Sequence, residues 1–393
     1  MRIGIDARTL GRGEVGLGVY TRQLVGRLSE SAPDWEFVLY GTRPLDAPAP
    51  GGANVRLSPL GLPWGRKIGN LVFEQHLLPV AVERDRCDLL WSPAFVLPLR
   101  RTTPQVVTIH DLIPFHFARS LTLPRRLVYN PLLRMNARDA DRIITVSESS
   151  AADLRRTLGV DPTKIRVIPN GRDERFTPLR GGEVPRLDRL LDELRIEPPY
   201  LLFTGGLLPR KNVHGLLSAF ARAIAWDRGH HLQSLVLTGK LDHGGNKSYV
   251  DRLRVLARRH GIEERVRFTG FRSREELRLL YGGAAMTADL SYHEGFGFPV
   301  LEAISCGCPV VVSSRSSLPE VAGDAALLAD PDSINEMALA IEKISGDPQL
   351  RDDLRRRGLA RARAFSWERS ALQTLEVFGE LLGGTRSTRR LAA

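Results

Sequence analysis

Two glutamates frame a glycine-rich turn in the segment Glu294-Gly-Phe-Gly-Phe-Pro-Val-Leu-Glu302. Gly295 and Gly297 permit backbone conformations that a Cβ would resist, and Pro299 suits the first turn of a helix. The pattern predicts a strand end, a loop and a helix N-terminus, where free N–H groups bind phosphates. Glu302 could then accept hydrogen bonds from sugar or ribose hydroxyls, and Glu294 could face a reacting centre. A helix cap with two surface glutamates would give the same pattern.

A second segment, Leu202-Phe-Thr-Gly-Gly-Leu-Leu-Pro-Arg-Lys-Asn212, ends a strand in glycines and places two cations before a helix. Arg210 offers a fork of donors and Lys211 a compact charge, a pair suited to a diphosphate. Lysine is rare in this arginine-rich chain, so Lys211 stands out from the background. The pattern favours phosphate binding over a solvated helix start.

Two weaker signals lie in the first half of the chain. The loop Gly11–Gly18 follows the first expected strand and could bring backbone N–H groups to a phosphate. It matches neither the P-loop nor the dinucleotide-binding fingerprint, and a surface loop is an equal alternative. His110 follows the expected strand Gln105–Ile109, where it could bond a sugar hydroxyl or simply its own loop. The histidines have no metal-ligand spacing, so we expect no bound metal.

Short apolar runs alternate with stretches of helical length along the chain, which is typical of parallel sheets covered on both faces. In the first half we expect strands at Arg2–Ile5, Phe37–Tyr40, Asp88–Trp91, Gln105–Ile109, Arg142–Val146 and Ile165–Ile168, and helices at Val19–Glu30, Lys67–Arg84, Arg126–Arg138 and Ser149–Leu158. In the second half we expect strands at Tyr200–Thr204, Ser234–Thr238, Val266–Thr269, Ala285–Leu290 and Val310–Val312, and helices at Val213–Trp226, Tyr249–Arg259, Glu275–Tyr281 and from Pro299.

A polar stretch rich in proline and glycine, about Arg172 to Pro199, interrupts this alternation and is expected to be a linker with a short helix. The sequence therefore predicts an α/β protein of two doubly wound, Rossmann-like domains facing across a cleft. Ligands of such domains bind at the carboxyl ends of the strands.

Charge and cysteine content bear on the partner and the cellular compartment that we expect for this protein. The chain has 393 residues and a net charge of +11, with 28 Lys/Arg against 20 Asp/Glu in residues 1–190 and 28 against 25 in residues 191–393. This basic first half suggests an anionic partner, although arginine-rich genome bias would produce the same excess. The three cysteines form no disulfide framework, and neither a signal peptide nor a transmembrane run is recognised, so we expect a cytoplasmic protein.

Taken together, these segments resemble glycosyltransferase family 4, retaining sugar-nucleotide transferases with the two-domain GT-B fold. The resemblance covers nearly the whole chain, through IGIDAR, GLGVYTRQL, HDLIPF, VSESSAADL and VIPNG, then LLFTGGLLPRKN, FTGF, EGFGFPVLEA and SSLPEVAGDAALL. HDLIPF and SSLPEVAGDAALL look most like bacterial mannosyltransferases of cell-surface polysaccharide synthesis, which implies GDP-mannose as donor. The resemblance also implies an acceptor-side domain at 1–185, a donor-binding domain at 196–365, and a C-terminal helix at 366–393 that returns to the first domain.

The same resemblance implies roles for individual residues. Glu302 would bind the donor ribose and Glu294 the transferred sugar, while Arg210 and Lys211 would hold the diphosphate. His110 would bond the sugar and support the transition state. The remaining donor-binding positions are Gly16, Gly18, Gly205, Gly270, Phe271, Gly295, Phe296 and Gly297. Gly16 and Gly18 would bring backbone to the phosphates, and the loop at Gly270 and Phe271 would lie near the nucleobase through its backbone. The arginine usual after the first glycines is Val19 here, so phosphate contact at that turn would rest on backbone alone.

The implied reaction is metal-independent front-face displacement, with the leaving phosphate accepting the acceptor's proton. The acceptor would be a glycan or lipid-linked oligosaccharide, which would bring the basic half to the anionic inner face of the cell membrane. Alternatives are a UDP-sugar donor, a GT-B epimerase or phosphorylase, a nicotinamide oxidoreductase, and a nucleic-acid-binding protein. The last two are disfavoured by the missing dinucleotide fingerprint and by basic residues that are not interleaved with aromatics.

Overall fold

The computed structural model describes residues 1–11, 16–42, 49–61, 66–117, 123–226, 232–241 and 247–383, with backbone alone at 66–68 and 123–129. The chain forms two compact units. The first comprises Met1–Gly171 together with the segment from Ser366 onwards, and the second comprises Arg172–Phe365. The N-terminal unit therefore ends earlier than the expected residue 185, and the expected linker belongs to the second unit.

The first unit is built on a parallel sheet in the order β3-β2-β1-β4-β5-β6-β7. Its strands are β1 Arg2–Asp6, β2 Glu36–Gly41, β3 Val55–Pro59, β4 Leu89–Ser92, β5 Gln105–Thr108, β6 Arg142–Thr145 and β7 Ile165–Val167. Strand order reverses beside β1, so β1 and β4 flank the position where an open α/β sheet binds its ligands.

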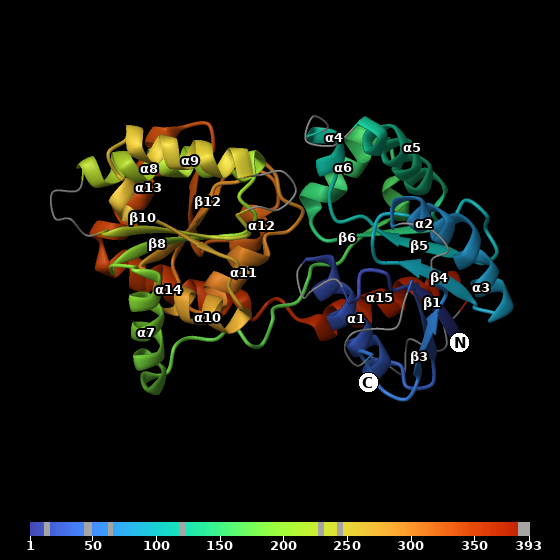
Figure 1. Ribbon diagram of the computed structural model, residues 1–393. Helices are drawn as coiled ribbons and strands as arrows, with labels where there is room; N and C mark the ends of the chain where they lie inside the picture. The colour runs from blue at the N-terminus through green and yellow to red at the C-terminus, as the bar shows by residue number, and fades with distance from the viewer. Residues whose placement is uncertain are drawn as a thin grey trace. The chain divides into compact units, whose positions relative to one another are not determined.

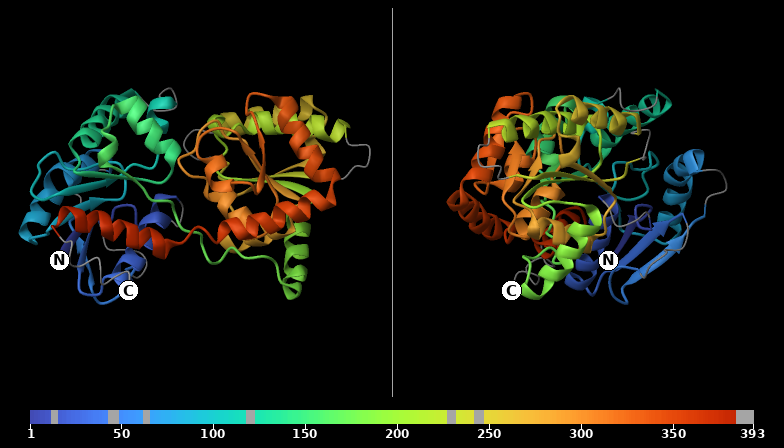
Figure 2. Two further views of the ribbon diagram at one scale, coloured as in Figure 1. Left: turned by 180° about the vertical axis from the view of Figure 1, so that it is seen from behind. Right: turned by 60° about the vertical axis from the view of Figure 1, so that its left-hand side comes forward.

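Helices cover both faces of this sheet (Figure 1). They are α1 Leu17–Ser31, α2 Arg66–Val72, the π-helix η1 Phe73–Leu77, α3 Leu78–Arg84, α4 Ile113–His116, α5 Leu123–Asp139, α6 Glu148–Leu158 and α15 Trp367–Leu381. The C-terminal α15 packs beside α1, and Phe378 on α15 stacks 5.8 Å from Trp91 of β4. In Figure 2 this red helix lies across the first unit.

The second unit is built on a parallel sheet in the order β10-β9-β8-β11-β12-β13. Its strands are β8 Tyr200–Thr204, β9 Ser234–Thr238, β10 Val266–Gly270, β11 Met286–Asp289, β12 Val310–Ser313 and β13 Ala326–Ala329. Its helices are α7 Val184–Leu194, α8 Val213–Trp226, α9 Lys247–Arg259, α10 Arg274–Gly283, α11 Phe298–Ser305, α12 Leu318–Ala322, α13 Ile334–Gly346 and α14 Pro348–Ala362. Figure 1 shows α8, α9 and α13 on one face and α10, α11 and α14 on the other.

Several elements differ from the sequence-based expectation, and each difference has a local reason. The edge strand β3 was not predicted because its exposed and polar residues break the continuous apolar run of a central strand. The edge strand β13 is apolar but only four residues long, which is too short for its pattern to distinguish a strand from a helix. The single helix expected over Lys67–Arg84 is divided into α2, η1 and α3, with Pro79 in the first turn of α3. Within the expected linker, α7 packs on α10 as part of the second unit.

The chain passes between the units at residues 171–172 and again at 365–366. The Arg172 N–H donates to the Phe365 carbonyl at 3.3 Å, so the two connections run side by side. A Cβ on Gly171 would lie 2.2 Å from the Trp367 nitrogen, and no larger residue fits there without a shift of backbone. Ser366 caps α15 by accepting from the Arg369 N–H.

Of the helices in the described ranges, none has both the length and the apolar character that a membrane crossing requires.

Candidate active site

The carboxyl edge of the second sheet brings two cations around one carboxylate. Arg210 Nη1 donates to Glu294 Oε1 at 2.7 Å, and Lys211 Nζ lies 2.7 Å from the same oxygen. Lys211 also lies 3.6 Å from Asp289 Oδ2. Lys211 and Asp289 are buried, and the Glu294 side chain is 12% exposed. The structure therefore joins three of the four residues proposed from the sequence as catalytic.

Burial and charge compete within this cluster. Burial raises the pKa of Glu294, but the opposing charges of Lys211 and Arg210 outweigh it and leave the pKa below its ordinary value. Burial likewise lowers the pKa of Lys211, yet Asp289 and Glu294 outweigh it and raise the pKa. Both groups are thus held in their charged forms.

A short turn fixes the two cations. Pro209–Lys211 forms a 3-10 turn, and Asn212 ends it in the left-handed conformation, with φ 53°. The Asn212 amide is buried and donates to the Pro331 carbonyl at 2.7 Å, while the Tyr292 N–H donates to the Arg210 carbonyl at 2.9 Å. The turn is therefore tied both to the loop after β13 and to the loop that carries Glu294.

Two serines hold the Glu294 loop. The Glu294 N–H donates to Ser316 Oγ at 2.9 Å, and the Ser316 hydroxyl donates back to the Glu294 carbonyl. The Ser317 hydroxyl lies 2.9 Å and 2.7 Å from the carbonyl oxygens of Glu294 and Phe296. Gly297 caps α11 with φ 115°, and a Cβ there would lie 2.7 Å from a Leu318 methyl. The glycine predicted at this turn is therefore required by both its conformation and its space.

Glu302 lies on α11 in a separate polar cluster. Tyr281 Oη donates to Glu302 Oε2 at 3.2 Å, and Arg274 Nη1 lies 3.9 Å from Oε1. Burial raises the pKa of Glu302 to about 7, against the opposite pull of Arg274 and Tyr281, while Asp173 adds to the rise. Arg274 is itself paired with Asp173 at 2.6 Å. Glu302 is thus a carboxyl group that sits near its own titration point at neutral pH.

The remaining predicted donor-binding positions of the second unit lie at the ends of β8 and β10 and in the turn before α11. Gly205 follows β8 with φ 135°, and a Cβ there would lie 3.7 Å from the Lys211 ammonium; Gly270 ends β10 with φ 75°. Phe271 is 56% exposed, with the Lys240 ammonium 5.7 Å from its ring centre. Phe296 instead is buried between Phe298 and Phe365, so its side chain packs rather than presents a surface, and Gly295 precedes it in the turn.

His110 lies after β5 in the first unit and is buried. Its Nε2 is 2.9 Å from the Pro93 carbonyl, which can only accept, so Nε2 carries the proton. The ring packs edge-on against Tyr20, with centroids 4.6 Å apart. Burial lowers the His110 pKa to about 4, against the smaller effect of the Pro93 carbonyl. The ring is therefore neutral near pH 7, with Nδ1 as an acceptor for a hydroxyl.

Gly16 forms the N-terminal boundary of α1 with φ 53°, and Gly18 lies in its first turn. A Cβ on Gly16 would meet nothing within 4 Å, so its backbone conformation alone accounts for glycine. Residues 12–15 of the glycine-rich loop lie outside the described residues.

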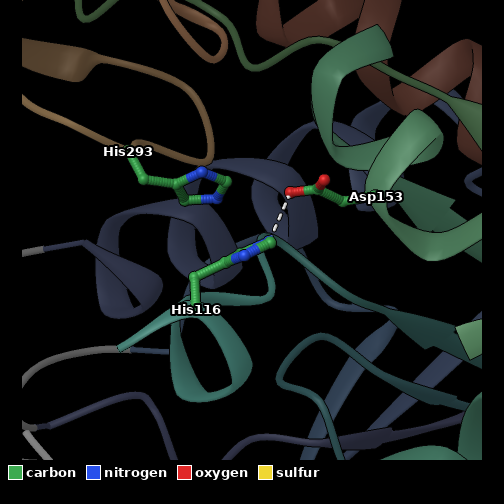
Figure 3. Close-up of side chains that lie close together, drawn as sticks. All are labelled: His116, Asp153 and His293. Carbon is green, nitrogen blue, oxygen red and sulfur yellow. Dashed lines mark hydrogen bonds and ion pairs between the residues drawn. The ribbon is translucent and has the colours of Figure 1, made fainter. Parts of the chain in front are cut away.

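A second histidine of the first unit is paired with a buried carboxylate. His116 Nε2 lies 2.9 Å from Asp153 Oδ2 (Figure 3), and Arg156 pairs with the other oxygen of Asp153. His116 follows His110 by six residues in the HDLIPFH segment, but its side chain points to α6 rather than joining His110 in one cluster.

Sequence reasoning missed the residues that support this site. Asp289 ends β11 five residues before Glu294, and an acid closing an apolar strand was the signal available for it. Tyr281 and Arg274 sit on α10, far from Glu302 in sequence, and only the packing of α10 on α11 brings them together. Ser316 and Ser317 gave no signal apart from their position after β12.

Comparisons with known proteins give the family and the fold of this chain. Residues 15–176 match the family described as Glycosyltransferase Family 4, and residues 191–361 match Glycosyl transferases group 1. The O-antigen chain mannosyltransferase B of Escherichia coli is 33% identical over 297 residues, 75% of each chain. The serotype-specific mannosyltransferase WbdA of E. coli is 28% identical over 72% of this chain, which spans 34% of that relative. HepE of Anabaena, solved with UDP and glucose, superposes with a TM-score of 0.72 at 20% identity over 97% of this chain and 99% of that one.

Two parallel-sheet Rossmann-like units have the GT-B fold, and the matched family models and the O-antigen mannosyltransferase relative show that the chain is a glycosyltransferase. The chain belongs to glycosyltransferase family 4.

Proposed function

We propose that this enzyme is a retaining mannosyltransferase that moves mannose from GDP-mannose to a glycan or lipid-linked oligosaccharide in polysaccharide synthesis. The observation that carries the proposal is the partly buried cluster in which Arg210 and Lys211 share Glu294 Oε1. The choice of mannose is supported by the O-antigen mannosyltransferase relative.

The cluster suits a diphosphate leaving group. Breaking the bond between sugar and phosphate develops negative charge on the nucleotide, and preorganised cations in a site shielded from water stabilise that charge. Lys211 is already held charged before any donor arrives, and Arg210 is paired with Glu294 beside it. Since these two cations can supply the stabilisation that a divalent ion supplies elsewhere, we propose that transfer needs no metal.

The state of Glu294 supports front-face displacement as the route to retention of the anomeric configuration. A double-displacement mechanism requires a free, nucleophilic carboxylate on the far face of the sugar. Glu294 is instead paired with two cations and has a lowered pKa, which makes it a poor nucleophile. We assign Glu294 to binding the transferred sugar, and the departing phosphate to accepting the proton of the acceptor hydroxyl.

The other residues take binding roles in this proposal. Glu302, half-buried beside Tyr281, would bond the ribose hydroxyls, and Gly205 would let the diphosphate approach Lys211 closely. Gly270 and Phe271 would adjoin the nucleobase at the end of β10. His110 would accept from a sugar hydroxyl through Nδ1. In the first unit, Gly16 and Gly18 would offer backbone N–H groups of the α1 terminus to phosphate.

Donor hydrolysis tests the reaction without knowledge of the acceptor. GDP-α-mannose is incubated with the enzyme in EDTA, and the first mannose released is observed by proton NMR before it mutarotates. We expect α-mannose, released by wild type and not by Lys211→Ala. Early β-mannose, or a covalent mannosyl adduct on Glu294 found by mass spectrometry, would contradict front-face displacement.

A UDP-sugar donor is the second candidate, because the similar fold of HepE was solved with UDP and glucose. The same hydrolysis assay with UDP-glucose and UDP-GlcNAc separates the two. Faster release from a uridine donor would replace GDP-mannose while keeping the site.

The acceptor side carries a separate proposal. Residues 1–190 hold 28 basic against 20 acidic residues, so we propose that an anionic membrane surface attracts this half of the chain. We expect partial sedimentation with phosphatidylglycerol vesicles at low salt, lost at high salt and absent with neutral vesicles. Protein that stays in the supernatant with anionic vesicles would contradict this surface.

A further inference from the structure

Asp289 is a buried carboxylate beside the cation cluster to which the proposed reaction assigns no role. It ends β11, is 2% exposed, and lies where the parallel strands present residues to ligand. Its neighbour Ser291 donates to Oδ1 through both its hydroxyl and its N–H, the latter at 3.3 Å. These bonds close a local turn and would by themselves explain an aspartate here.

The second oxygen is not explained by that turn. Within the described parts of the chain, Asp289 Oδ2 accepts no hydrogen bond, although it is shielded from solvent. A buried carboxylate oxygen without a partner costs stability unless a charge compensates it. The compensating charge is the Lys211 ammonium, 3.6 Å away. Oδ2 is therefore directed at Lys211 rather than at the strand or the turn.

The geometry of Lys211 shows why a second carboxylate matters. An ammonium has three N–H donors. One is engaged by Glu294 Oε1 at 2.7 Å, and Asp289 Oδ2 lies within ion-pair distance of another. A third is left for a phosphate oxygen, on the side where Gly205 leaves room beside the ammonium. Glu294, however, is also paired with Arg210. To bind the sugar, it would have to give up some of its bonds to the two cations.

On the assumption that the cluster binds a donor diphosphate as proposed above, we propose that Asp289 is a positioning residue for Lys211. It keeps the ammonium charged and aimed at the leaving phosphate while Glu294 exchanges its bonds to the cations for bonds to the transferred sugar. Asp289 touches neither donor nor acceptor and acts through Lys211 alone.

Removing the carboxylate has a defined consequence for Lys211. The charged groups that face Lys211 are Asp289 on β11, Glu294 on the following loop and Arg210 beside it on the 3-10 turn. Without Asp289, burial still lowers the Lys211 pKa, Arg210 still repels its charge, and only Glu294 opposes them. The Lys211 pKa should fall, and the alkaline limb of the activity profile should move to lower pH.

The test compares Asp289→Asn with Thr287→Val. Asparagine keeps the shape and the Ser291 bonds but removes the charge. Thr287 is a buried polar residue on the same strand, where it contacts Cys308 rather than Lys211, so its variant controls for polarity lost from β11. In Asp289→Asn we expect kcat to fall roughly tenfold to a hundredfold, the alkaline limb to move to lower pH, and the Kd for GDP to stay equal or tighten. Thr287→Val should change none of these.

A second readout needs no donor. The titration of Lys211 is followed by NMR of lysine labelled with 13C at Cε, assigned with Lys211→Ala. We expect the Lys211 titration to move to lower pH in Asp289→Asn and not in Thr287→Val. An unmoved titration would overturn the proposal even if GDP-mannose is not the donor. A moved titration with no transfer by wild type would contradict the proposed function instead. If Asp289→Asn fails to fold, Asp289→Ser is measured in the same way.

Discussion

Glu294 and Lys211 form a buried ion pair, with 2.7 Å between Oε1 and Nζ, in which each partner holds the other charged against the effect of burial. Glu294 is also paired with Arg210, so one carboxylate keeps two cations in place before the donor binds. Under the proposed function, donor binding is an exchange in which phosphate oxygens take over bonds to the cations that Glu294 makes in this structure.

Lys211→Ala tests the electrostatic role of the lysine. Loss of one preorganised donor to the leaving group should lower kcat by about a hundredfold to a thousandfold. It also leaves Asp289 and Glu294 buried with one fewer cation, so the melting temperature should fall. Donor hydrolysis and thermal unfolding are measured beside Lys343→Ala, which removes an exposed lysine of α13. Equal activity in Lys211→Ala and Lys343→Ala would show that Lys211 has no role in catalysis.

Glu294→Gln separates the sugar-binding role of Glu294 from its charge. Glutamine keeps the length of the side chain but no longer neutralises Arg210 and Lys211, so the site becomes more positive. We expect tighter binding of GDP together with slower transfer, measured by calorimetry and by donor hydrolysis. Weaker GDP binding in a folded variant would show that Glu294 does not compete with phosphate for the two cations.

Glu302 should make stability depend on pH. Its folded-state pKa of about 7 lies above the ordinary value of 4.5, so the folded protein holds the proton more tightly than the unfolded chain. This contribution is fully present below pH 4.5 and is lost as the pH rises through 7. Glu302→Gln should therefore unfold at similar denaturant concentration to wild type near pH 4.5, and be more stable at pH 8 by up to about 3 kcal/mol.

The control for Glu302 is Glu275→Gln, an exposed glutamate of α10. A stability difference between Glu302→Gln and wild type that does not change with pH would contradict the raised pKa.

His110→Gln tests the acceptor role of the ring. The glutamine amide can still donate to the Pro93 carbonyl in place of Nε2, but it offers no acceptor at the position of Nδ1. The variant should fold and lose about tenfold in transfer rate, because the sugar hydroxyl then lacks its partner. Circular dichroism and donor hydrolysis measure the two properties. Wild-type turnover in a folded His110→Gln would show that His110 has a structural role and does not bind the sugar.

The sequence predicts much of the fold because parallel strands buried on both faces leave continuous apolar runs, as at Tyr200–Thr204 and Ser234–Thr238. The expected α/β class and two-sheet organisation are confirmed. The edge strand β3 was missed because its exposed and polar residues lack that signal, and β13 because four apolar residues are too few to distinguish a strand from a helix. The break of the expected Lys67–Arg84 helix into three pieces was also missed, because a π-turn leaves no mark in apolar spacing.

The site could be predicted only where the chain itself places functional groups in sequence. Arg210 and Lys211 are adjacent, and the EGFGFPVLE turn carries both glutamates, so these were found. The second carboxylate of Lys211 and the Tyr281 partner of Glu302 depend on neighbouring elements that are brought together only by packing. Phe296 was expected to contact the donor, but its ring is buried among Phe298 and Phe365, and its role in binding is left to its backbone.

The most direct measurement is a thermal-shift comparison of GDP-mannose with UDP-glucose, UDP-GlcNAc, ADP-glucose and NADH on wild type and Lys211→Ala. A ligand that binds only the folded state raises the melting temperature in proportion to its affinity. Each ligand is measured with and without EDTA. We predict that GDP-mannose gives the largest rise in wild type, that EDTA does not reduce it, and that Lys211→Ala loses most of it. A larger rise with a uridine nucleotide, or a rise that disappears in EDTA, would contradict a metal-independent GDP-mannose site.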